Sequence, residues 1–224
     1  MKRGEWRPIP VLERPKVPVY ERRLAPPILK QRRRIDLRIS RGEILDIALA
    51  VGAISLVYLS MVFHYLRPIV AVYILGTVLL AFLVHEMAHK YAAINYGYSA
   101  RFRATKEGLL ITAISALLPI KIIAPGYVAV YSSTGLYDPK RVGIVALVGP
   151  LSNVILSMLG IGLLGYAPLL SRFLAIINAD IALFNLLPLP VLDGSKVATW
   201  SWKIWLAVFA PVVLLWFYVR FVLF

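Results

Sequence analysis

Residues 68–96 read PIVAVYILGTVLLAFLVHEMAHKYAAINY, an apolar stretch with His-Glu-Met-Ala-His at positions 85–89. As a helix rising 1.5 Å per residue, this stretch is long enough to cross a hydrocarbon layer of about 30 Å. Two histidines four residues apart share one helical face, so both imidazoles can reach one zinc ion. Ionisable groups inside a membrane are expensive and usually functional. The stretch therefore predicts a membrane-spanning helix that binds a metal.

The composition excludes an ordinary soluble enzyme. Hydrophobic residues make up 60% of the 224 residues, charged residues make up 16%, and the mean hydropathy is +0.76. Soluble domains are about 45–50% apolar. There is no cysteine, so the chain has no disulfide and no thiolate metal site. Any metal must be held by His, Asp, Glu or water.

Further apolar stretches flank the first one and predict an all-α polytopic membrane protein with about five to six transmembrane helices. We expect these other spans at 44–64, 141–166, 172–187 and 197–224.

The segment 105–133 is apolar but broken by prolines and a lysine, and it lies between the second and third spans. Within it, 121–131 is β-branched and aromatic around a Pro-Gly turn signal. We interpret this part as a short re-entrant β-strand or hairpin at the membrane rim. Irregular backbone at that depth is tolerated only against protein or a wet cavity. A strand there could also hold an unwound substrate segment by edge pairing.

Residues 1–43 hold 13 of the 25 Lys and Arg together with six prolines. They predict a basic, Pro-rich, disordered cytoplasmic arm that contacts anionic lipid headgroups, followed by a transmembrane domain at 44–224. We expect no nucleic-acid binding, because no aromatic residues are interleaved with the basic ones. With this arm inside, seven cations fall on the cytoplasmic side and three outside, as the positive-inside rule requires. The inner ones are Arg101, Arg103, Lys106, Lys140, Arg141, Lys196 and Lys203, and the outer ones Arg67, Arg172 and Arg220.

A catalytic zinc needs a third protein ligand and an open fourth position. Asp193 stands out among the acids beyond the arm, because Pro188 and Pro190 must break the helix before it and Gly194 permits a tight turn after it. Glu86 flanks the two histidines, where it can bond a metal-bound water without displacing it, as a general base must. The other acids in this part of the chain are Asp46, Glu107, Asp138 and Asp180.

H-E-x-x-H in one span, followed by N-x-x-P-x-P-x-x-D-G at 185–194, resembles the site-2 protease family, the intramembrane zinc metalloproteases. Gly149-Pro150-Leu151-Ser152-Asn153 is similar to the G-P-x-x-N element of that family, and Asn178 stands where an upstream asparagine often does. The resemblance covers about 69–195, the catalytic core. Ala88 departs from the usual glycine. The chain length suggests a minimal form without a PDZ or CBS domain.

The resemblance implies one Zn²⁺ per chain, with His85, His89 and Asp193 as ligands. It implies Glu86 as the general base and Asn185 as a polar group beside the reacting carbonyl. The expected activity is zinc-dependent endopeptidase cleavage in or near the transmembrane helix of a membrane-protein substrate, the chemistry of regulated intramembrane proteolysis. We expect a multi-pass protein of a prokaryotic plasma membrane. The scarcity of Gln and Asn hints at a hot habitat.

Two other readings stay open. Broken helices and buried carboxylates also mark transport sites, so a metal-binding transporter is one alternative. A catalytically silent membrane scaffold that keeps the metal is the other. The role of Glu86 distinguishes a protease from these two alternatives, because a protein that only holds zinc does not need a general base.

Overall fold

The computed structural model describes residues 39–65, 67–119, 121–132 and 137–223. The expected arm therefore lies outside the described residues except for its last five. There the structure differs from the expected border at 43, because helix α1 already begins at Arg41. Ser40 sets this start, since its hydroxyl accepts a hydrogen bond of 3.2 Å from the backbone N–H of Glu43.

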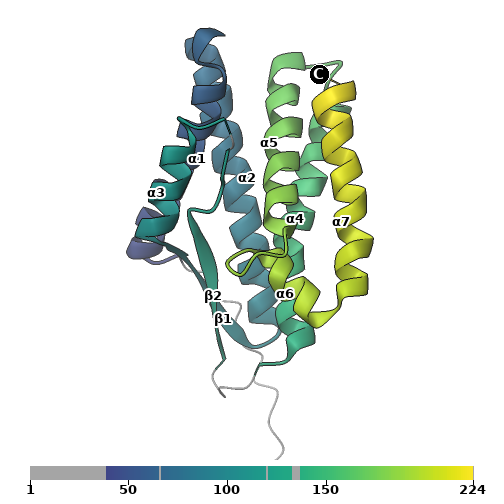
Figure 1. The fold of residues 1–224 in the computed structure, drawn as a ribbon. Coiled ribbons are helices and arrows are strands. Elements are labelled where there is room, and N and C mark those ends of the chain that lie inside the picture. The colour runs from purple at the N-terminus through teal and green to yellow at the C-terminus, as the bar shows by residue number, and fades with distance from the viewer. Residues whose placement is uncertain (1–38, 66, 120, 133–136, 224) are drawn as a thin grey trace, which may run out of the picture. The chain divides into compact units, whose positions relative to one another are not determined.

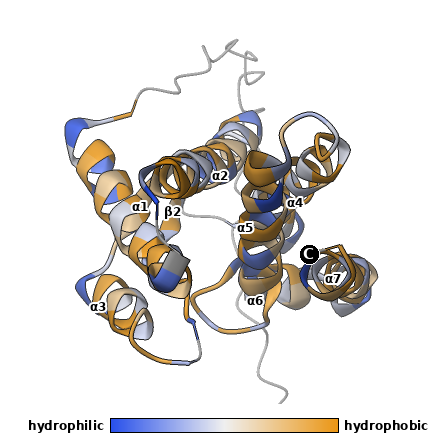
Figure 2. Ribbon diagram, turned by 90° about the horizontal axis from the view of Figure 1, so that it is seen from above, coloured by the Kyte–Doolittle hydropathy of each residue, from blue (hydrophilic) through white to orange (hydrophobic). Residues whose placement is uncertain are grey.

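Among the described residues, five helices are long and apolar enough to cross a membrane, in agreement with the five to six that the sequence predicts, and the chain is an all-α polytopic membrane protein. Apolar residues predominate along all of them (Figure 2). They are α1 (Arg41–Met61), α2 (Pro68–Asn95), α4 (Pro139–Gly162), α5 (Pro168–Leu186) and α7 (Trp202–Phe217), the last extended by a π-helical turn at Tyr218–Val222.

The region between α2 and α4 contains two strands and a helix (Figure 1). Strand β1 (Tyr98–Ala104) pairs antiparallel with β2 (Gly126–Ser132), and helix α3 (Lys106–Ser115) lies between them in sequence. The expectation of a strand within 121–131 is confirmed by β2, with its bounds moved to Gly126–Ser132, and the alternative of a local hairpin is not what the structure shows. The pairing strand comes from the residues directly after α2, where Tyr98, Ala100 and Phe102 alternate buried with more exposed neighbours.

The last predicted span, 197–224, is not one helix. Helix α6 (Asp193–Trp200) ends at Ser201, whose backbone is extended. The Ser201 hydroxyl then accepts a hydrogen bond from the backbone N–H of Ile204 at 3.4 Å and starts α7. The serine thus acts as a cap that breaks the apolar run, which hydropathy alone does not reveal.

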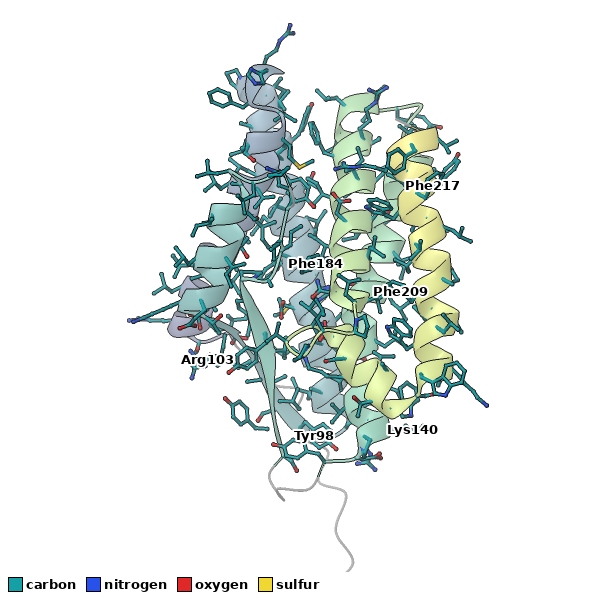
Figure 3. The ribbon with its side chains drawn as sticks, viewed as in Figure 1. Tyr98, Arg103, Lys140, Phe184, Phe209 and Phe217 are labelled. Atoms are coloured by element: carbon teal, nitrogen blue, oxygen red, sulfur yellow. The ribbon has the colours of Figure 1, made fainter. Side chains whose placement is uncertain are left out.

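Helix α5 lies at the centre of the bundle and α7 at its surface. Half of the apolar window of α5 is buried, against 11% for α7. Helix α4 packs against α2, α5 and α6, so it connects α2 to the later helices of the bundle. Tyr98 and Lys140 lie at the end of the bundle that holds the sheet and α6, and Phe217 lies toward the opposite end (Figure 3).

A buried ion pair joins the start of α1 to the end of α2. The Lys90 ammonium lies 3.0 and 3.2 Å from the two carboxylate oxygens of Glu43, and both side chains are buried. The same carboxylate accepts a hydrogen bond of 3.3 Å from the backbone N–H of Phe102 in β1. This pair therefore fastens the sheet to the helix that carries the two histidines.

Replacing Lys90 by methionine would leave the Glu43 carboxylate buried without its cation. Breaking a buried pair in this way costs about 3–5 kcal/mol. We expect Lys90→Met to unfold at a clearly lower temperature in detergent micelles, followed by tryptophan fluorescence. The double variant Glu43→Gln, Lys90→Met, which buries no charge, should regain part of the loss. Equal melting temperatures for Lys90→Met and the parent protein would contradict a stabilising role.

Candidate metal centre

His85 and His89 lie one turn apart on the buried face of α2, with 3% and 1% of their surface exposed. Each ring has its Nδ1 atom engaged away from the other histidine. The Nδ1 of His89 lies 2.6 Å from the carbonyl oxygen of Val145, and the Nδ1 of His85 lies 2.6 Å from Oδ1 of Asn153. A carbonyl oxygen can only accept, so His89 carries its proton on Nδ1 and presents a lone pair on Nε2.

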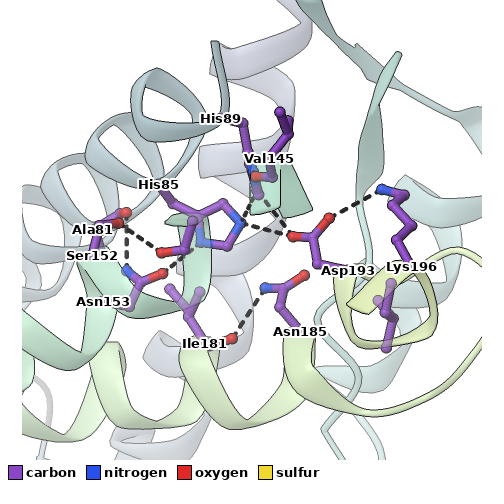
Figure 4. A network of polar contacts seen from close by, with 12 residues as sticks. Ala81, His85, His89, Val145, Ser152, Asn153, Ile181, Asn185, Asp193 and Lys196 are labelled. Atoms are coloured by element: carbon purple, nitrogen blue, oxygen red, sulfur yellow. Dashed lines mark hydrogen bonds and ion pairs between the residues drawn. The ribbon is translucent and has the colours of Figure 1, made fainter. Parts of the chain in front are cut away.

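A chain of amides fixes the same tautomer for His85, and Figure 4 shows its first member, Asn153, beside the ring. The Asn153 amide nitrogen donates to the carbonyl of Ala81 at 3.1 Å and to Oδ1 of Asn178 at 2.8 Å. The Asn178 nitrogen in turn donates to the carbonyl of Leu174 at 2.8 Å. With its nitrogen so used, Asn153 must accept through Oδ1. His85 therefore donates through Nδ1 and leaves Nε2 as an acceptor.

Asp193 reaches the histidines because the chain reverses after α5. The loop Pro188–Leu192 leads into α6, whose first residue is Asp193. A side chain at Gly194 would overlap the carbonyl groups of Leu186 and Leu187, so glycine lets α6 begin directly against the end of α5. The Trp205 indole donates a hydrogen bond of 2.8 Å to the Leu186 carbonyl, which the broken helix would otherwise leave without a partner.

Three acceptor atoms converge at this point. The Nε2 atoms of His85 and His89 lie 2.9 Å apart. Oδ2 of Asp193 lies 2.9 Å from Nε2 of His89 and 3.4 Å from Nε2 of His85. Three lone pairs at such distances repel one another unless a cation lies between them. Tetrahedral zinc, at about 2.0–2.2 Å from each ligand, sets ligand atoms roughly 3.3 Å apart. The donor set and its spacing therefore fit zinc, and these residues form a group that could hold a metal ion.

The other oxygen of Asp193 has a cation of its own. The Lys196 ammonium, one turn later in α6, lies 3.0 Å from Oδ1. An ammonium at this distance favours the ionised form of the Asp193 carboxyl. The carboxylate is thus ionised and turned with Oδ2 toward the histidines.

Glu86 and Asn185, the two other predicted site residues, line one small cavity beside the histidines. This cavity measures about 30 Å³ and also borders His85 and Gly126. The Oε2 atom of Glu86 is buried and has no hydrogen-bond partner among the described residues. Asn185 donates to the carbonyl of Ile181 at 3.0 Å, which leaves its second N–H for another acceptor. One water needs roughly 10–15 Å³, so the cavity has room for a water next to Glu86.

Asp180, left without a role by the sequence, does not join this group. Its carboxylate accepts hydrogen bonds from Tyr58 at 3.2 Å and from the Trp216 indole at 2.7 Å. It therefore ties α5 to α1 and α7. Sequence reasoning also did not identify the Val145 carbonyl or Lys196 as partners of the metal-facing residues. The spacing of Lys196 three residues after Asp193 could have indicated this ion pair, because residues three apart on a helix are neighbours.

The chain is similar to three curated proteins, each named "Putative zinc metalloprotease". MJ0611 of Methanocaldococcus jannaschii is 35% identical over 192 residues, covering 79% of this chain and 93% of its own length. YwhC of Bacillus subtilis is 30% identical over 154 residues, 56% of this chain and 67% of its own. Rip2 of Mycolicibacterium smegmatis is 32% identical over 134 residues, 52% of each. No family model matches the chain, and no solved structure matches it significantly.

The match to MJ0611 spans nearly all of that relative, and the convergent histidines and carboxylate agree with its name. The chain belongs to this zinc metalloprotease family.

Gly149 of α4 supplies the space in which the two imidazoles lie. A Cβ atom at this position would overlap the His89 ring and come within 2.8 Å of Nε2 of His85. We expect Gly149→Ala to displace the histidines and to lose most of the zinc of the purified protein, measured by inductively coupled plasma mass spectrometry. Gly162→Ala on the same helix, where a Cβ atom meets nothing within 4 Å, is the matched control. Full zinc content in Gly149→Ala would contradict this arrangement.

Asn153 should tune zinc affinity through His85. Removing a hydrogen-bond partner of a metal ligand costs about 10–100-fold in affinity. We expect Asn153→Ala to raise the zinc Kd by about that factor in competition with a chromogenic chelator. Ser157→Ala removes another buried polar side chain of α4, one that bonds the carbonyl of Ala175 at 2.9 Å, and should leave the Kd unchanged. Equal effects of both variants would point to general loosening of the helix.

Proposed function

We propose that this protein is an intramembrane zinc endopeptidase of the site-2 protease type, which hydrolyses peptide bonds in or near the transmembrane segment of other membrane proteins. One observation carries the proposal: Glu86, whose buried Oε2 has no hydrogen-bond partner among the described residues, lines a water-sized cavity with His85, and both residues belong to a helix long and apolar enough to span a membrane. A metal site used only for binding or transport has no need of a buried carboxylate held without a partner.

His85, His89 and Asp193 would hold one zinc ion. Zinc in such a site lowers the pKa of water toward about 7 and polarises a peptide carbonyl. Glu86 accepts a proton from the attacking water and passes it to the leaving amine, so that one water is consumed, the C–N bond breaks, and a carboxylate and an amine result. Asn185 donates its remaining N–H to the carbonyl oxygen as negative charge develops there.

The arrangement of charge supports a cytoplasmic N-terminus. The residues expected inside, Arg103 and Lys140 among them, belong to the end of the bundle that carries the sheet and α6 (Figure 3). On this orientation the site opens toward the cytoplasmic leaflet of a prokaryotic plasma membrane, with the basic arm against anionic headgroups. The organisms of all three relatives are prokaryotes, which supports that membrane.

The substrate we propose is a membrane protein with a transmembrane helix. The carbonyls of a helix are engaged in its own hydrogen bonds, so the segment must unwind before attack. Strand β2 pairs with β1 along one edge only in the two-stranded sheet. Its other edge could receive the unwound segment as an added strand, with the scissile carbonyl beside His85 and His89.

Glu86→Gln tests the role of the base against the transporter and scaffold alternatives. We expect the variant to keep its zinc and to lose at least about 100-fold in cleavage of a model single-span substrate in proteoliposomes. A chelator should stop cleavage by the parent protein, and added zinc should restore it. Cleavage at the parental rate by Glu86→Gln would overturn the proposal, as would a parent protein that binds zinc but cleaves no membrane substrate.

A further inference from the structure

A second cavity borders His89 and Asp193, and Glu86 is not among its lining residues. It measures about 200 Å³, and His89, Asp193 and Lys196 form one side of it. It is therefore far larger than the 30 Å³ cavity at Glu86, and much larger than one or two waters need. A space of this size beside the reacting atoms suits a side chain better than a water.

The remaining walls of this cavity are almost entirely aliphatic. The residues besides the three at the metal centre are Val128, Val130, Tyr137, Val142, Val145 and Ala146. They offer mainly dispersion contacts, and the Tyr137 hydroxyl already donates to the Val130 carbonyl at 3.3 Å. The two charged groups of the cavity, Asp193 and Lys196, pair with each other at 3.0 Å, so a charged side chain entering it would lose hydration and compete with this pair. The lining therefore selects for an aliphatic side chain.

Strand β2 connects the two cavities. Gly126 at its start lines the small cavity, and Val128 and Val130 line the large one. Residues two apart on a strand share a face, so the strand presents its two valines to the same space. A peptide laid along β2 would pass both cavities, the small one bordered by His85 and the large one by His89 and Asp193.

We propose that the cavity lined by Val128, Val130 and Val142 is a specificity pocket that takes a branched aliphatic side chain, such as leucine, flanking the scissile bond. The inference rests on the proposed function and adds to it a substrate preference. Adding bulk at Val142, in the first turns of α4, should reduce the pocket without touching the metal-facing atoms.

The test compares Val142→Phe with Val154→Phe. Val154 lies on the same helix but lines a different cavity, of about 410 Å³, with Pro211 and Val212, so it is a matched control for added bulk. The substrates are single-span fusion proteins whose cleavage site is first located by mass spectrometry. The residue on each side of that bond is then changed in turn to Leu, Ala, Asp or Lys.

The parent protein should cleave the Leu substrate with a kcat/KM at least about 10-fold above that of the Ala substrate, for one of the two flanking positions. Val142→Phe should abolish this preference by slowing the Leu substrate while it still cleaves the Ala substrate. Val154→Phe should keep it. No preference for Leu in the parent protein, a preference for Asp or Lys, or equal behaviour of the two variants would overturn the inference while leaving the endopeptidase activity standing.

A binding readout guards against variants that merely fold badly. The chain has no cysteine, so single cysteines can be placed in the Glu86→Gln protein at Val142 or at Val154. A substrate with one cysteine in place of the flanking residue should form a disulfide with the first variant and not with the second. A disulfide with neither, or equally with both, would overturn the assignment of the pocket whether or not cleavage is detected.

Discussion

Three acceptor atoms facing one another inside a helical bundle are the constraint on which the rest of this structure depends. The Nε2 atoms of His85 and His89 and Oδ2 of Asp193 lie 2.9 to 3.4 Å apart, a spacing that suits the ligands of one metal ion. Each group also contacts a partner through its other polar atom: His85 the Asn153 side-chain oxygen, His89 the Val145 carbonyl, and Asp193 the Lys196 ammonium. These partners come from α4 and α6, so the centre is a property of the whole bundle.

Bringing a carboxylate to a helix more than 100 residues earlier requires a break in the membrane-embedded backbone. Two prolines follow the end of α5, and Gly194 lets α6 start against that end. The Trp205 indole donates a hydrogen bond to the Leu186 carbonyl, which the end of α5 leaves without a helical partner. Each device replaces a hydrogen bond or removes a clash that a bilayer interior would otherwise make costly. The break thus brings the Asp193 carboxylate to the two histidines and is tolerated because protein surrounds it.

The two-stranded sheet gives the centre two unlike sides. Gly126 lines a small cavity together with Glu86, and Val128 and Val130 line a larger, mainly aliphatic one. Under the proposed function, the small cavity would hold water and the larger one a substrate side chain. The buried Glu43–Lys90 pair and the Glu43 contact to Phe102 attach the sheet to α1 and α2.

The amino-acid sequence alone predicted five to six spans and the H-E-x-x-H pair, because hydropathy over twenty residues and the spacing of residues on one helix are local properties. It also singled out Asp193, through the prolines and glycine around it. Strand β1 was missed because its alternation is short and its partner lies about 28 residues further along. Other features emerged only from the folded bundle. They are the helix break at Ser201, the contacts of Val145 with His89 and of Lys196 with Asp193, and the hydrogen bonds of Asp180 with Tyr58 and Trp216. Side chains far apart in sequence meet only through helix packing, and residue spacing carries no record of that packing.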